Sequence, residues 1–383
     1  MKPKRNAKTI IIAAGGTSGH IYPAFAIASG IRAVFPQVRF IFCGVAGGLE
    51  EKMVADEGHE FYPIPAQNIP SRHDPRFFSW IGNNCKGLMR SRALLRKERP
   101  GLVIGTGGFV SAPLVAAARS MGIPYILHEQ NAVPGRANRL LAGKARAVFI
   151  SYEDSRPYFK KKARLLFSGN PVRPLFFELD RKKARARLDI DDQVFLVLVM
   201  GGSLGSRTLN TAVARLDEEG GWSSLLRRHP ELGLAISTGV QSSAGLADQI
   251  GLMPGVIQAS PFLHDAPYWI AACDLFVGRA GAMTCAEIAS QGRPSILVPF
   301  PFAVDDHQTV NARSMEQAGA AVVIEDGAFQ SRLLLETLAE MIENPGRLEA
   351  MSASAYGWAT PEAAAIIAAK ALAVIHEDEA GRP

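Results

Sequence analysis

A histidine at the end of a glycine-rich turn is the first feature of this chain that could do chemistry. The stretch GGTSGH (15–20) follows the apolar run TIIIAA (9–14). Glycines after a strand let the backbone approach a phosphate, and a following helix N-terminus favours anions. The spacing G-G-x-x-G differs from the G-x-G-x-x-G of nicotinamide-binding domains, which need no histidine there. His20 is therefore open to three roles: ligand contact, catalytic group or turn residue.

A second turn of the same kind opens the other half of the chain. FLVLVMGGSLGS (195–206) repeats the strand, the paired glycines, a hydroxyl at Ser203 and a further glycine. Ser206 stands where the first turn has His20. The shared glycines indicate common architecture, and the histidine is particular to the first half.

Polar side chains also follow the strand PYIL, in the segment HEQN (128–131). Ligands of open α/β sheets bind outside the carboxyl ends of the strands. We therefore expect this segment to face a ligand cleft rather than the core, with capping or a turn as the alternative role of Asn131.

Arg173, in GNPVRP (169–174), lies at the junction of the two halves, where a guanidinium can bind phosphate. Solvent exposure is the alternative for this arginine.

The stretch GRAGAMTCAEIASQGRP (278–294) predicts a glycine turn and then a helix that begins near Ala282. Such a helix N-terminus suits a diphosphate, and the Glu287 carboxylate suits ribose hydroxyls. A solvated Glu287 is the alternative.

Metal and disulfide sites are disfavoured. The run DDH (305–307) has no second ligand cluster, so sugar contacts or capping are favoured over a metal. The four cysteines lack C-x-x-C spacing, which argues for a reducing compartment. Three of them have apolar neighbours and are expected in the core: Cys43, Cys273 and Cys285.

Strands and helices alternate along the chain and must position these loops. Strands are expected at 9–14, 38–43, 102–106, 124–128, 147–150, 165–168, 194–200, 233–238, 274–277, 295–298 and 321–324, with a weak one near 256. The alternation predicts parallel α/β sheets, and the repeated turn predicts two Rossmann-like, doubly wound domains that face each other across a cleft. We divide the chain into a first domain (1–170), a second domain (171–352) and a C-terminal helix (353–383). The stretch 352–377 is expected as one helix that packs back on either domain.

Charge is unevenly distributed. Residues 1–173 contain 26 Lys and Arg against 10 Asp and Glu, although the whole chain has a net charge of +6. An anionic partner is expected for this half: a membrane surface, nucleic acid or a phosphorylated substrate. No apolar run reaches the roughly 18 residues of a membrane span. Two glycines interrupt the apolar stretch near the N-terminus, which argues against a secretion signal.

The segment 75–99 interleaves apolar residues with cations, as expected at an anionic bilayer surface. A helix that packs its apolar side inward is the alternative. The apolar residues are Phe77, Phe78, Trp80, Ile81, Leu88 and Met89, and the cations are Arg76, Lys86, Arg90, Arg92, Arg96, Lys97 and Arg99.

In this order, the loops resemble those of the MurG family of bacterial glycosyltransferases. The matching stretches are GGTSGHIYPA, GTGGFVSAP, HEQNAVPGRAN, GNPVR, GGSLGS, AGAMTCAEIASQGRPSILVPFP and DHQTVNA, and they cover nearly the whole chain. The resemblance implies a GT-B fold and inverting transfer of N-acetylglucosamine from UDP-GlcNAc to the 4-hydroxyl of the muramyl sugar of lipid I, giving lipid II for peptidoglycan. It implies no cofactor and no essential metal. Ser18 departs from the family's usual G-G-T-G-G-H.

The resemblance also implies roles for individual residues. A sugar hydroxyl is a poor nucleophile and needs a base, which we hypothesise to be His20; orienting the acceptor or a diphosphate is its alternative role. Thr17, Ser18 and Gly19 are placed at the donor–acceptor junction. Donor-binding roles fall on Asn131, Arg173, Ser203, the backbone near Leu263, the turn of Ala282, Met283 and Thr284, Glu287 (ribose) and Gln308 (sugar).

The implied partners are UDP-GlcNAc, lipid I and the anionic inner leaflet, with the enzyme peripheral on the cytoplasmic face of the bacterial inner membrane. Cell-wall synthesis or division proteins are further implied partners. A related enzyme acting on a diacylglycerol-type lipid is the alternative. A nicotinamide oxidoreductase would need the missing fingerprint, and a nucleic-acid-binding protein would need a recognised module or stacking aromatics on strands.

Overall fold

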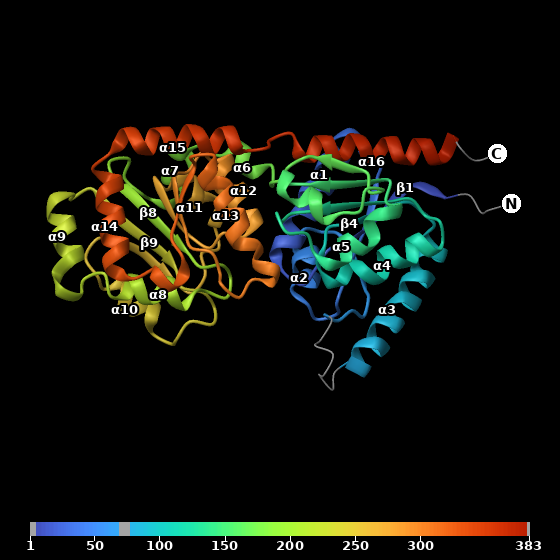
Figure 1. The fold of residues 1–383 in the computed structure, drawn as a ribbon, viewed down its shortest axis with the longest axis horizontal. Coiled ribbons are helices and arrows are strands. Elements are labelled where there is room, and N and C mark those ends of the chain that lie inside the picture. The colour runs from blue at the N-terminus through green and yellow to red at the C-terminus, as the bar shows by residue number, and fades with distance from the viewer. Residues whose placement is uncertain (1–4, 69–76, 381–383) are drawn as a thin grey trace. The chain divides into compact units, whose positions relative to one another are not determined.

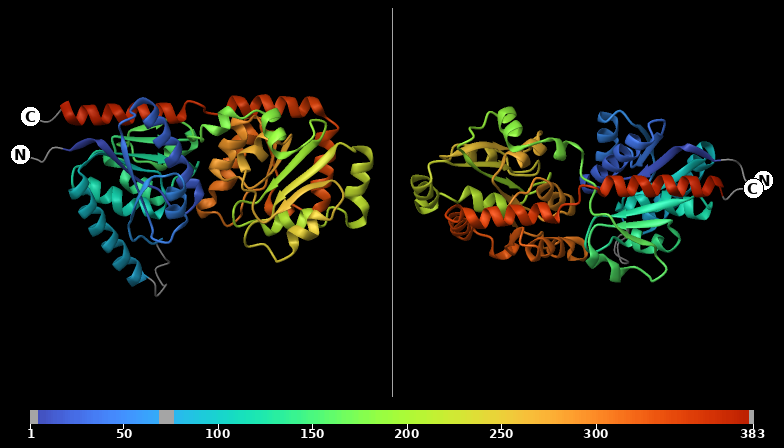
Figure 2. Two further views of the ribbon diagram at one scale, coloured as in Figure 1. Left: turned by 180° about the vertical axis from the view of Figure 1, so that it is seen from behind. Right: turned by 90° about the horizontal axis from the view of Figure 1, so that it is seen from above.

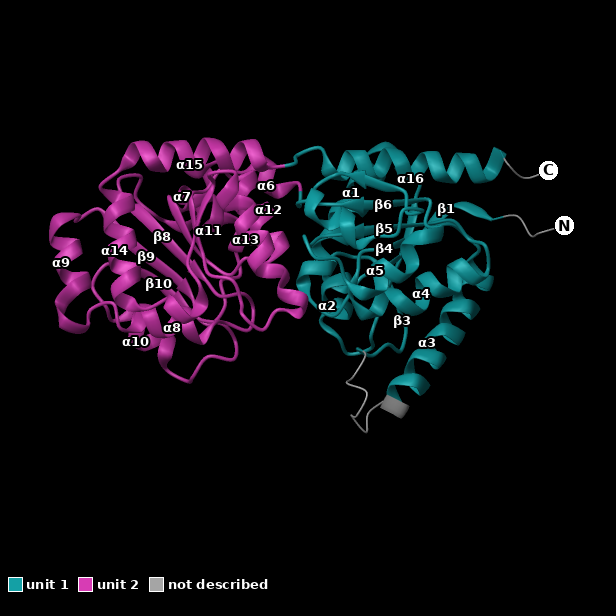
Figure 3. Cartoon of the chain, viewed as in Figure 1, with its two compact units in different colours: residues 1–173, 360–383 teal, residues 174–359 magenta. Residues whose placement is uncertain are grey.

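The chain forms two compact units, each built on one parallel sheet. The computed structural model describes residues 5–68 and 77–380, apart from the side chains of Phe77 and Phe78. One unit contains residues 1–173 and 360–383, and the other contains residues 174–359 (Figure 3).

The first unit holds a seven-stranded sheet in the order β3-β2-β1-β4-β5-β6-β7 (Figure 1). Its strands are β1 (Asn6–Ala13), β2 (Arg39–Gly44), β3 (Glu60–Pro63), β4 (Pro100–Gly105), β5 (Tyr125–Glu129), β6 (Ala147–Ile150) and β7 (Leu165–Phe167). Its helices are α1 (Ser18–Val34), α2 (Leu49–Asp56), α3 (Phe77–Glu98), α4 (Gly108–Ser120), α5 (Arg136–Leu141), η1 (Ala142–Lys144), η2 (Glu153–Tyr158) and α16 (Ala363–Ala380). The strand order reverses between β1 and β4, so the loops after these strands border the crevice where such sheets bind ligands.

Helices cover both faces of this sheet. Successive strand side chains point to opposite faces, so Ile10 and Ile12 of β1 pack with α1 and α16, whereas Ile11 and Ala13 pack with α3 and α4. Figure 2 shows α16 running beside α1. Burial on both faces explains why β1 is apolar throughout its second half instead of alternating.

The second unit holds a six-stranded sheet in the order β10-β9-β8-β11-β12-β13. Its strands are β8 (Phe195–Met200), β9 (Leu232–Ser237), β10 (Val256–Ser260), β11 (Leu275–Gly278), β12 (Ser295–Leu297) and β13 (Ala321–Val323). Its helices are α6 (Leu175–Glu178), α7 (Arg181–Leu188), α8 (Arg207–Ala214), η3 (Glu218–Gly220), α9 (Gly221–Arg228), α10 (Leu246–Gly251), α11 (Ala266–Ala272), α12 (Ala282–Ser290), η4 (Val304–Asp306), α13 (His307–Gln317), η5 (Asp326–Ala328), α14 (Ser331–Ile342) and α15 (Pro345–Trp358). Here the order reverses between β8 and β11. The doubly wound prediction is confirmed for both sheets, and Cys43, Cys273 and Cys285 are buried as expected.

The C-terminal helix prediction is wrong in one respect. The stretch 352–377 is not one helix, because α15 ends at Trp358 and α16 begins at Ala363. Pro361 lacks an N–H group and disfavours helical geometry at Thr360, which accounts for the break. The two helices belong to different units.

One stretch of the described residues, Pro345–Ala380, is long and apolar enough to cross a membrane by length and composition. It contains the break between α15 and α16. Ile367, Ala371 and Val374 of α16 are buried in the core of the first unit, which accounts for its apolar character.

Candidate functional site

The first glycine turn leads directly into α1. This helix begins at Ser18, so Ser18, Gly19 and His20 form its first turn and Thr17 is its N-cap. The left-handed backbone of the turn falls on Gly16, with φ of +89°. Ser18 is helical, so the family's glycine at this position is not needed for a positive φ.

The His20 side chain begins a chain of hydrogen bonds into the first unit. Its Nδ1 lies 3.1 Å from Oε1 of Gln130. The Gln130 Nε2 donates to the Thr106 carbonyl at 2.7 Å and lies 2.8 Å from Nδ1 of His128. The His128 Nε2 lies 3.1 Å from the Gly169 carbonyl. The chain links the loops after β1, β4, β5 and β7.

Burial corrects one expectation about the HEQN segment. Only Asn131 is partly exposed, whereas His128, Glu129 and Gln130 are at most 2% exposed and lie in the interior. Hydrogen bonds with backbone and side-chain groups of neighbouring segments satisfy their polar atoms, which allows burial. Desolvation, opposed by the hydrogen bond to Gly169, lowers the pKa of His128 to about 4, so its ring is neutral near pH 7.

The Glu129 carboxylate organises the loop that follows β5. It accepts hydrogen bonds from the Gly135 N–H at 2.9 Å, from Asn138 Nδ2 at 2.8 Å and from the Asn131 N–H at 3.2 Å. Asn131 is thereby fixed at the rim of the first unit.

Arg173 is not a solvated linker residue. Its guanidinium carbon lies 4.1 Å from the centroid of the Tyr22 ring, a cation–π arrangement. Tyr22 is two residues beyond His20 on α1. A guanidinium thus lies beside the start of the helix that carries the histidine.

In the second unit, the turn after β8 exposes Ser203. Ser206, which corresponds to His20, is buried and caps α8 by accepting a hydrogen bond from the Leu209 N–H at 3.3 Å. It also accepts from Arg279 Nη2 at 2.6 Å. The equivalent of the histidine is therefore structural in the second unit.

The helix predicted near Ala282 is confirmed as α12, which begins at that residue after extended Gly281. Ala282 and Met283 are buried, whereas Thr284 and Glu287 are half-buried and three residues apart, so they share one side of the helix. Leu263, in the loop after β10, is buried, with 5% of its surface exposed.

Arg279 supports the turn before α12. It forms an ion pair of 2.5 Å with Asp326 and donates to the carbonyls of Val298 and Pro299, each at 3.0 Å. These bonds tie the loops after β11, β12 and β13 together.

Gln308 lies on the first turn of α13, and its Oε1 accepts a hydrogen bond from the Phe300 N–H at 3.0 Å. Asp305 and Asp306 just before it both have φ of +53°, and the Asp306 carboxylate accepts a hydrogen bond from Thr309 Oγ1 at 2.7 Å but none from a backbone N–H of α13. Within residues 5–68 and 77–380, no group of three or more His, Cys, Asp or Glu is arranged to hold a metal.

The structure therefore gathers the predicted residues into two groups, one on each unit. Thr17, Ser18, Gly19, His20, Asn131 and Arg173 belong to the first unit, and Ser203, Leu263, Ala282, Met283, Thr284, Glu287 and Gln308 belong to the second. Sequence reasoning missed the contact between His20 and Gln130. The available signal was the H-x-Q spacing at the end of β5.

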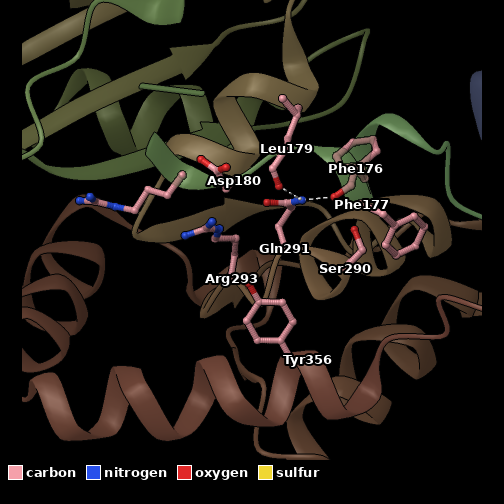
Figure 4. Close-up of a pocket in the computed structure, with 9 residues that line it drawn as sticks. Phe176, Phe177, Leu179, Asp180, Ser290, Gln291, Arg293 and Tyr356 are labelled. Carbon is pink, nitrogen blue, oxygen red and sulfur yellow. Dashed lines mark hydrogen bonds between the residues drawn. The ribbon is translucent and has the colours of Figure 1, made fainter. Parts of the chain in front are cut away.

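A pocket in the second unit lies near the amino end of β12, on the side of the sheet opposite the carboxyl ends of the strands (Figure 4). It is lined by Phe176, Phe177, Leu179, Asp180, Arg181, Ser290, Gln291, Arg293 and Tyr356. Arg293 precedes β12, and the Gln291 amide donates to the carbonyls of Phe176 and Leu179. Since ligands of such sheets bind beyond the carboxyl ends of the strands, this pocket is not the candidate site.

Comparison with known families matches residues 10–150 to the glycosyltransferase family 28 N-terminal domain and residues 196–369 to the glycosyltransferase family 28 C-terminal domain. A protein of Desulforudis audaxviator is 38% identical over 363 residues, covering 92% of this chain and 95% of that protein. One of Alkaliphilus metalliredigens is 32% identical, covering 96% and 99%. Both are named UDP-N-acetylglucosamine–N-acetylmuramyl-(pentapeptide) pyrophosphoryl-undecaprenol N-acetylglucosamine transferase. The crystal structure of Acinetobacter baumannii MurG is 26% identical, with a TM-score of 0.71 over 94% of this chain and 98% of that one.

The chain belongs to the MurG family of glycosyltransferases. MurG-family membership confirms the resemblance carried by the loops, and the likeness to the MurG crystal structure confirms the GT-B fold. A UDP-GlcNAc 2-epimerase from Neisseria meningitidis, at 14% identity and a TM-score of 0.65, shares the fold alone.

Proposed function

We propose that this chain transfers N-acetylglucosamine from UDP-GlcNAc to the 4-hydroxyl of the muramyl sugar of lipid I, with inversion, to give lipid II. The observation that carries the proposal is the set of relatives named for this reaction, which are 32–38% identical over at least 90% of the chain. Both glycosyltransferase family 28 domains support it.

The proposed reaction is one displacement at the anomeric carbon. The acceptor oxygen attacks the face opposite the diphosphate, and a new C–O bond forms as the bond to UDP breaks. The bonding electron pair leaves with UDP, and the hydroxyl proton passes to His20. A single displacement inverts the anomeric centre, and a positioned base contributes roughly 10²–10⁴-fold to such a step.

The leaving UDP accumulates negative charge, which the protein must stabilise. We assign this role to the N-terminus of α12 at Ala282, Met283 and Thr284, together with Ser203 and Arg173. Helix N–H groups and a guanidinium act on charge as it develops in the transition state. The cation–π contact with Tyr22 orders the Arg173 guanidinium within the first unit, beside the start of α1.

The remaining donor contacts follow from side-chain chemistry. Glu287 would accept hydrogen bonds from the ribose hydroxyls, and the backbone near Leu263 and the Asn131 side chain would complete the donor site. The Gln308 Oε1 is already held by the Phe300 N–H, so the amide NH₂ is the end that would donate to the sugar. Thr17, Ser18 and Gly19 would lie where donor and acceptor meet.

We further propose that the enzyme binds the anionic cytoplasmic face of the inner membrane through α3. Leu94 and Leu95 anchor its C-terminal half in the core. Its N-terminal half projects from the first unit (Figure 1). Ile81, in that half, and Met89, near the middle of the helix, have 41% and 61% of their surfaces exposed, and Met89 lies within three residues of two exposed cations.

Those cations are Lys86 and Arg90, one turn apart. Exposed apolar side chains near exposed cations suit an anionic lipid surface, whereas the alternative of an inward-packed helix fits the buried residues of α3, Leu94 and Leu95. Arg76 and the side chains of Phe77 and Phe78, also predicted for this surface, lie outside the described residues. Cell-wall synthesis or division proteins remain a predicted class of partner.

The test is transfer of radiolabel from UDP-GlcNAc to a lipid I analogue, with His20→Ala as the comparison. We expect a labelled disaccharide lipid from the wild type and a turnover at least about 100-fold lower from the variant. Label transferred to diacylglycerol but not to lipid I would favour the alternative acceptor. Near-normal turnover of His20→Ala at saturating substrates would remove the base role.

A further inference from the structure

We propose that Gln130 is a positioning residue that holds the neutral His20 ring with its proton on Nδ1, so that Nε2 carries the lone pair for the acceptor hydroxyl. The catalytic role of Gln130 rests on the proposed function. The hydrogen bonds that fix the His20 ring follow from the geometry alone.

The orientation of the Gln130 amide is determined by the Thr106 carbonyl. A carbonyl oxygen only accepts hydrogen bonds, so the amide atom 2.7 Å from it must be the NH₂ nitrogen. The other end of the amide, Oε1, then faces His20 Nδ1 at 3.1 Å. Because Oε1 also only accepts, Nδ1 must carry a proton, and in the neutral ring Nε2 does not.

The His128 ring accepts the second proton of the Gln130 amide nitrogen, which agrees with this orientation of the amide. Its Nε2 faces the Gly169 carbonyl at 3.1 Å, so that nitrogen is the donor and Nδ1 is the acceptor. Nδ1 lies 2.8 Å from the Gln130 nitrogen. The backbone carbonyls of Thr106 and Gly169 thus end this series of hydrogen bonds. Only one arrangement of protons gives each donor an acceptor.

This series of hydrogen bonds is also rigid. Gln130, His128 and Thr106 are at most 1% exposed, and burial keeps the pKa of His128 at about 4, so that its Nδ1 remains an acceptor. The Thr106 hydroxyl donates to the His20 carbonyl at 2.8 Å, which holds the backbone of the histidine as well. A buried network in which every group is paired favours one geometry.

A neutral amide differs from the carboxylate that orients histidine in many hydrolases. It selects the tautomer through a hydrogen bond but adds no negative charge beside the ring. The imidazolium formed when the hydroxyl proton arrives at Nε2 keeps its Nδ1–H bond to Gln130, so the ring need not move between the two states.

The test compares Gln130→Met, which retains bulk but cannot accept from Nδ1, with Tyr125→Phe. Tyr125 is on the same strand, and its hydroxyl donates to the Leu141 carbonyl at 2.7 Å. Tyr125→Phe thus removes one buried hydrogen bond but leaves the hydrogen bonds of His20, Gln130 and His128 in place. We expect Gln130→Met to lower kcat roughly 10- to 1000-fold with the KM for UDP-GlcNAc unchanged. Tyr125→Phe should change kcat less than about twofold, since it leaves His20 and its partners in place.

A second measurement reads the tautomer without turnover. Long-range ¹H–¹⁵N correlation of histidine-labelled protein, assigned with His20→Ala, should show His20 protonated on Nδ1 in the wild type and a mixture of tautomers in Gln130→Met. Protonation on Nε2 in the wild type, or a kcat of Gln130→Met equal to that of Tyr125→Phe, would overturn the proposal. If the folded wild type transfers no sugar, the proposed function fails, and the spectrum alone decides the role of Gln130.

Discussion

Gly107 packs against the His20 ring so closely that a Cβ at this position would lie 3.0 Å from Nδ1 and 3.3 Å from Oε1 of Gln130. Its φ is +94°, which L side chains rarely adopt. The glycine in the loop after β4 therefore leaves the space in which the histidine meets the amide.

Gly107→Ala should destabilise the first unit and displace His20. Left-handed strain alone costs about 1–3 kcal/mol, and the new methyl group would press on the hydrogen bond between His20 and Gln130. Urea unfolding measures the first effect and kcat the second. Gly82→Ala is the matched control, because Gly82 lies in α3 with open space around it. It should stabilise by roughly 0.5–1 kcal/mol, and equal effects of the two substitutions would contradict the packing argument.

His128 should make the stability of the protein depend on pH. Its pKa is about 4 in the folded state, against 6.5 for an unperturbed histidine. Between these values the unfolded chain binds the additional proton, so the free energy of unfolding falls as the pH is lowered from about 6.5 to 4. The full loss is about 3 kcal/mol, and it levels off below pH 4, where His128 is protonated in the folded state as well.

The measurement is urea unfolding of the wild type and of His128→Gln at pH 7 and pH 5. Gln keeps hydrogen-bonding groups at this position but does not titrate. Because burial also lowers the pKa of His59, the informative quantity is the difference between the two proteins. If the free energy of unfolding had the same dependence on pH in both proteins, protonation of His128 would not be the cause of the loss of stability.

Much of the architecture could be predicted from the sequence because it depends on local signals. Continuous apolar runs with glycine turns predict buried parallel strands, and they predict, at least approximately, twelve of the thirteen strands in the described part of the chain. The exception, β3 (Glu60–Pro63), is four residues long, lies at the sheet edge and ends in a proline. It is defined by its pairing with β2, which no local pattern reveals.

The candidate site was less predictable because its chemistry depends on contacts across the chain. The spacing of HEQN indicated the carboxyl end of a strand, but exposure was inferred from polarity, and His128, Glu129 and Gln130 are buried. The partners of His128 and Gln130 are Thr106, Gly169 and His20, which come from three other parts of the chain. A polar residue can be buried when such distant groups satisfy it, and the sequence alone does not specify which groups these are.

Charge reversal on α3 should weaken binding to anionic vesicles. Lys86→Glu with Arg90→Glu removes two exposed cations next to Met89, and each cation near a membrane surface contributes about 1 kcal/mol. We expect affinity to fall more than about tenfold in cosedimentation with vesicles containing anionic lipid. Lys160→Glu with Lys161→Glu makes the same change of charge at exposed positions outside α3. An equal loss in this control would assign binding to net charge rather than to the helix.

The donor contacts can be separated by titrating UDP and UDP-GlcNAc calorimetrically. Glu287→Gln should weaken both ligands about equally, by roughly tenfold, because the ribose is common to them. Gln308→Glu can still accept from the Phe300 N–H, which preserves the local structure, but it loses the NH₂ donor. It should weaken UDP-GlcNAc by roughly tenfold while leaving UDP within about twofold, since only the former carries the sugar. A Gln308→Glu variant that lost UDP binding to the same extent would place Gln308 at the nucleotide instead, and one that bound both ligands normally would remove it from the donor site.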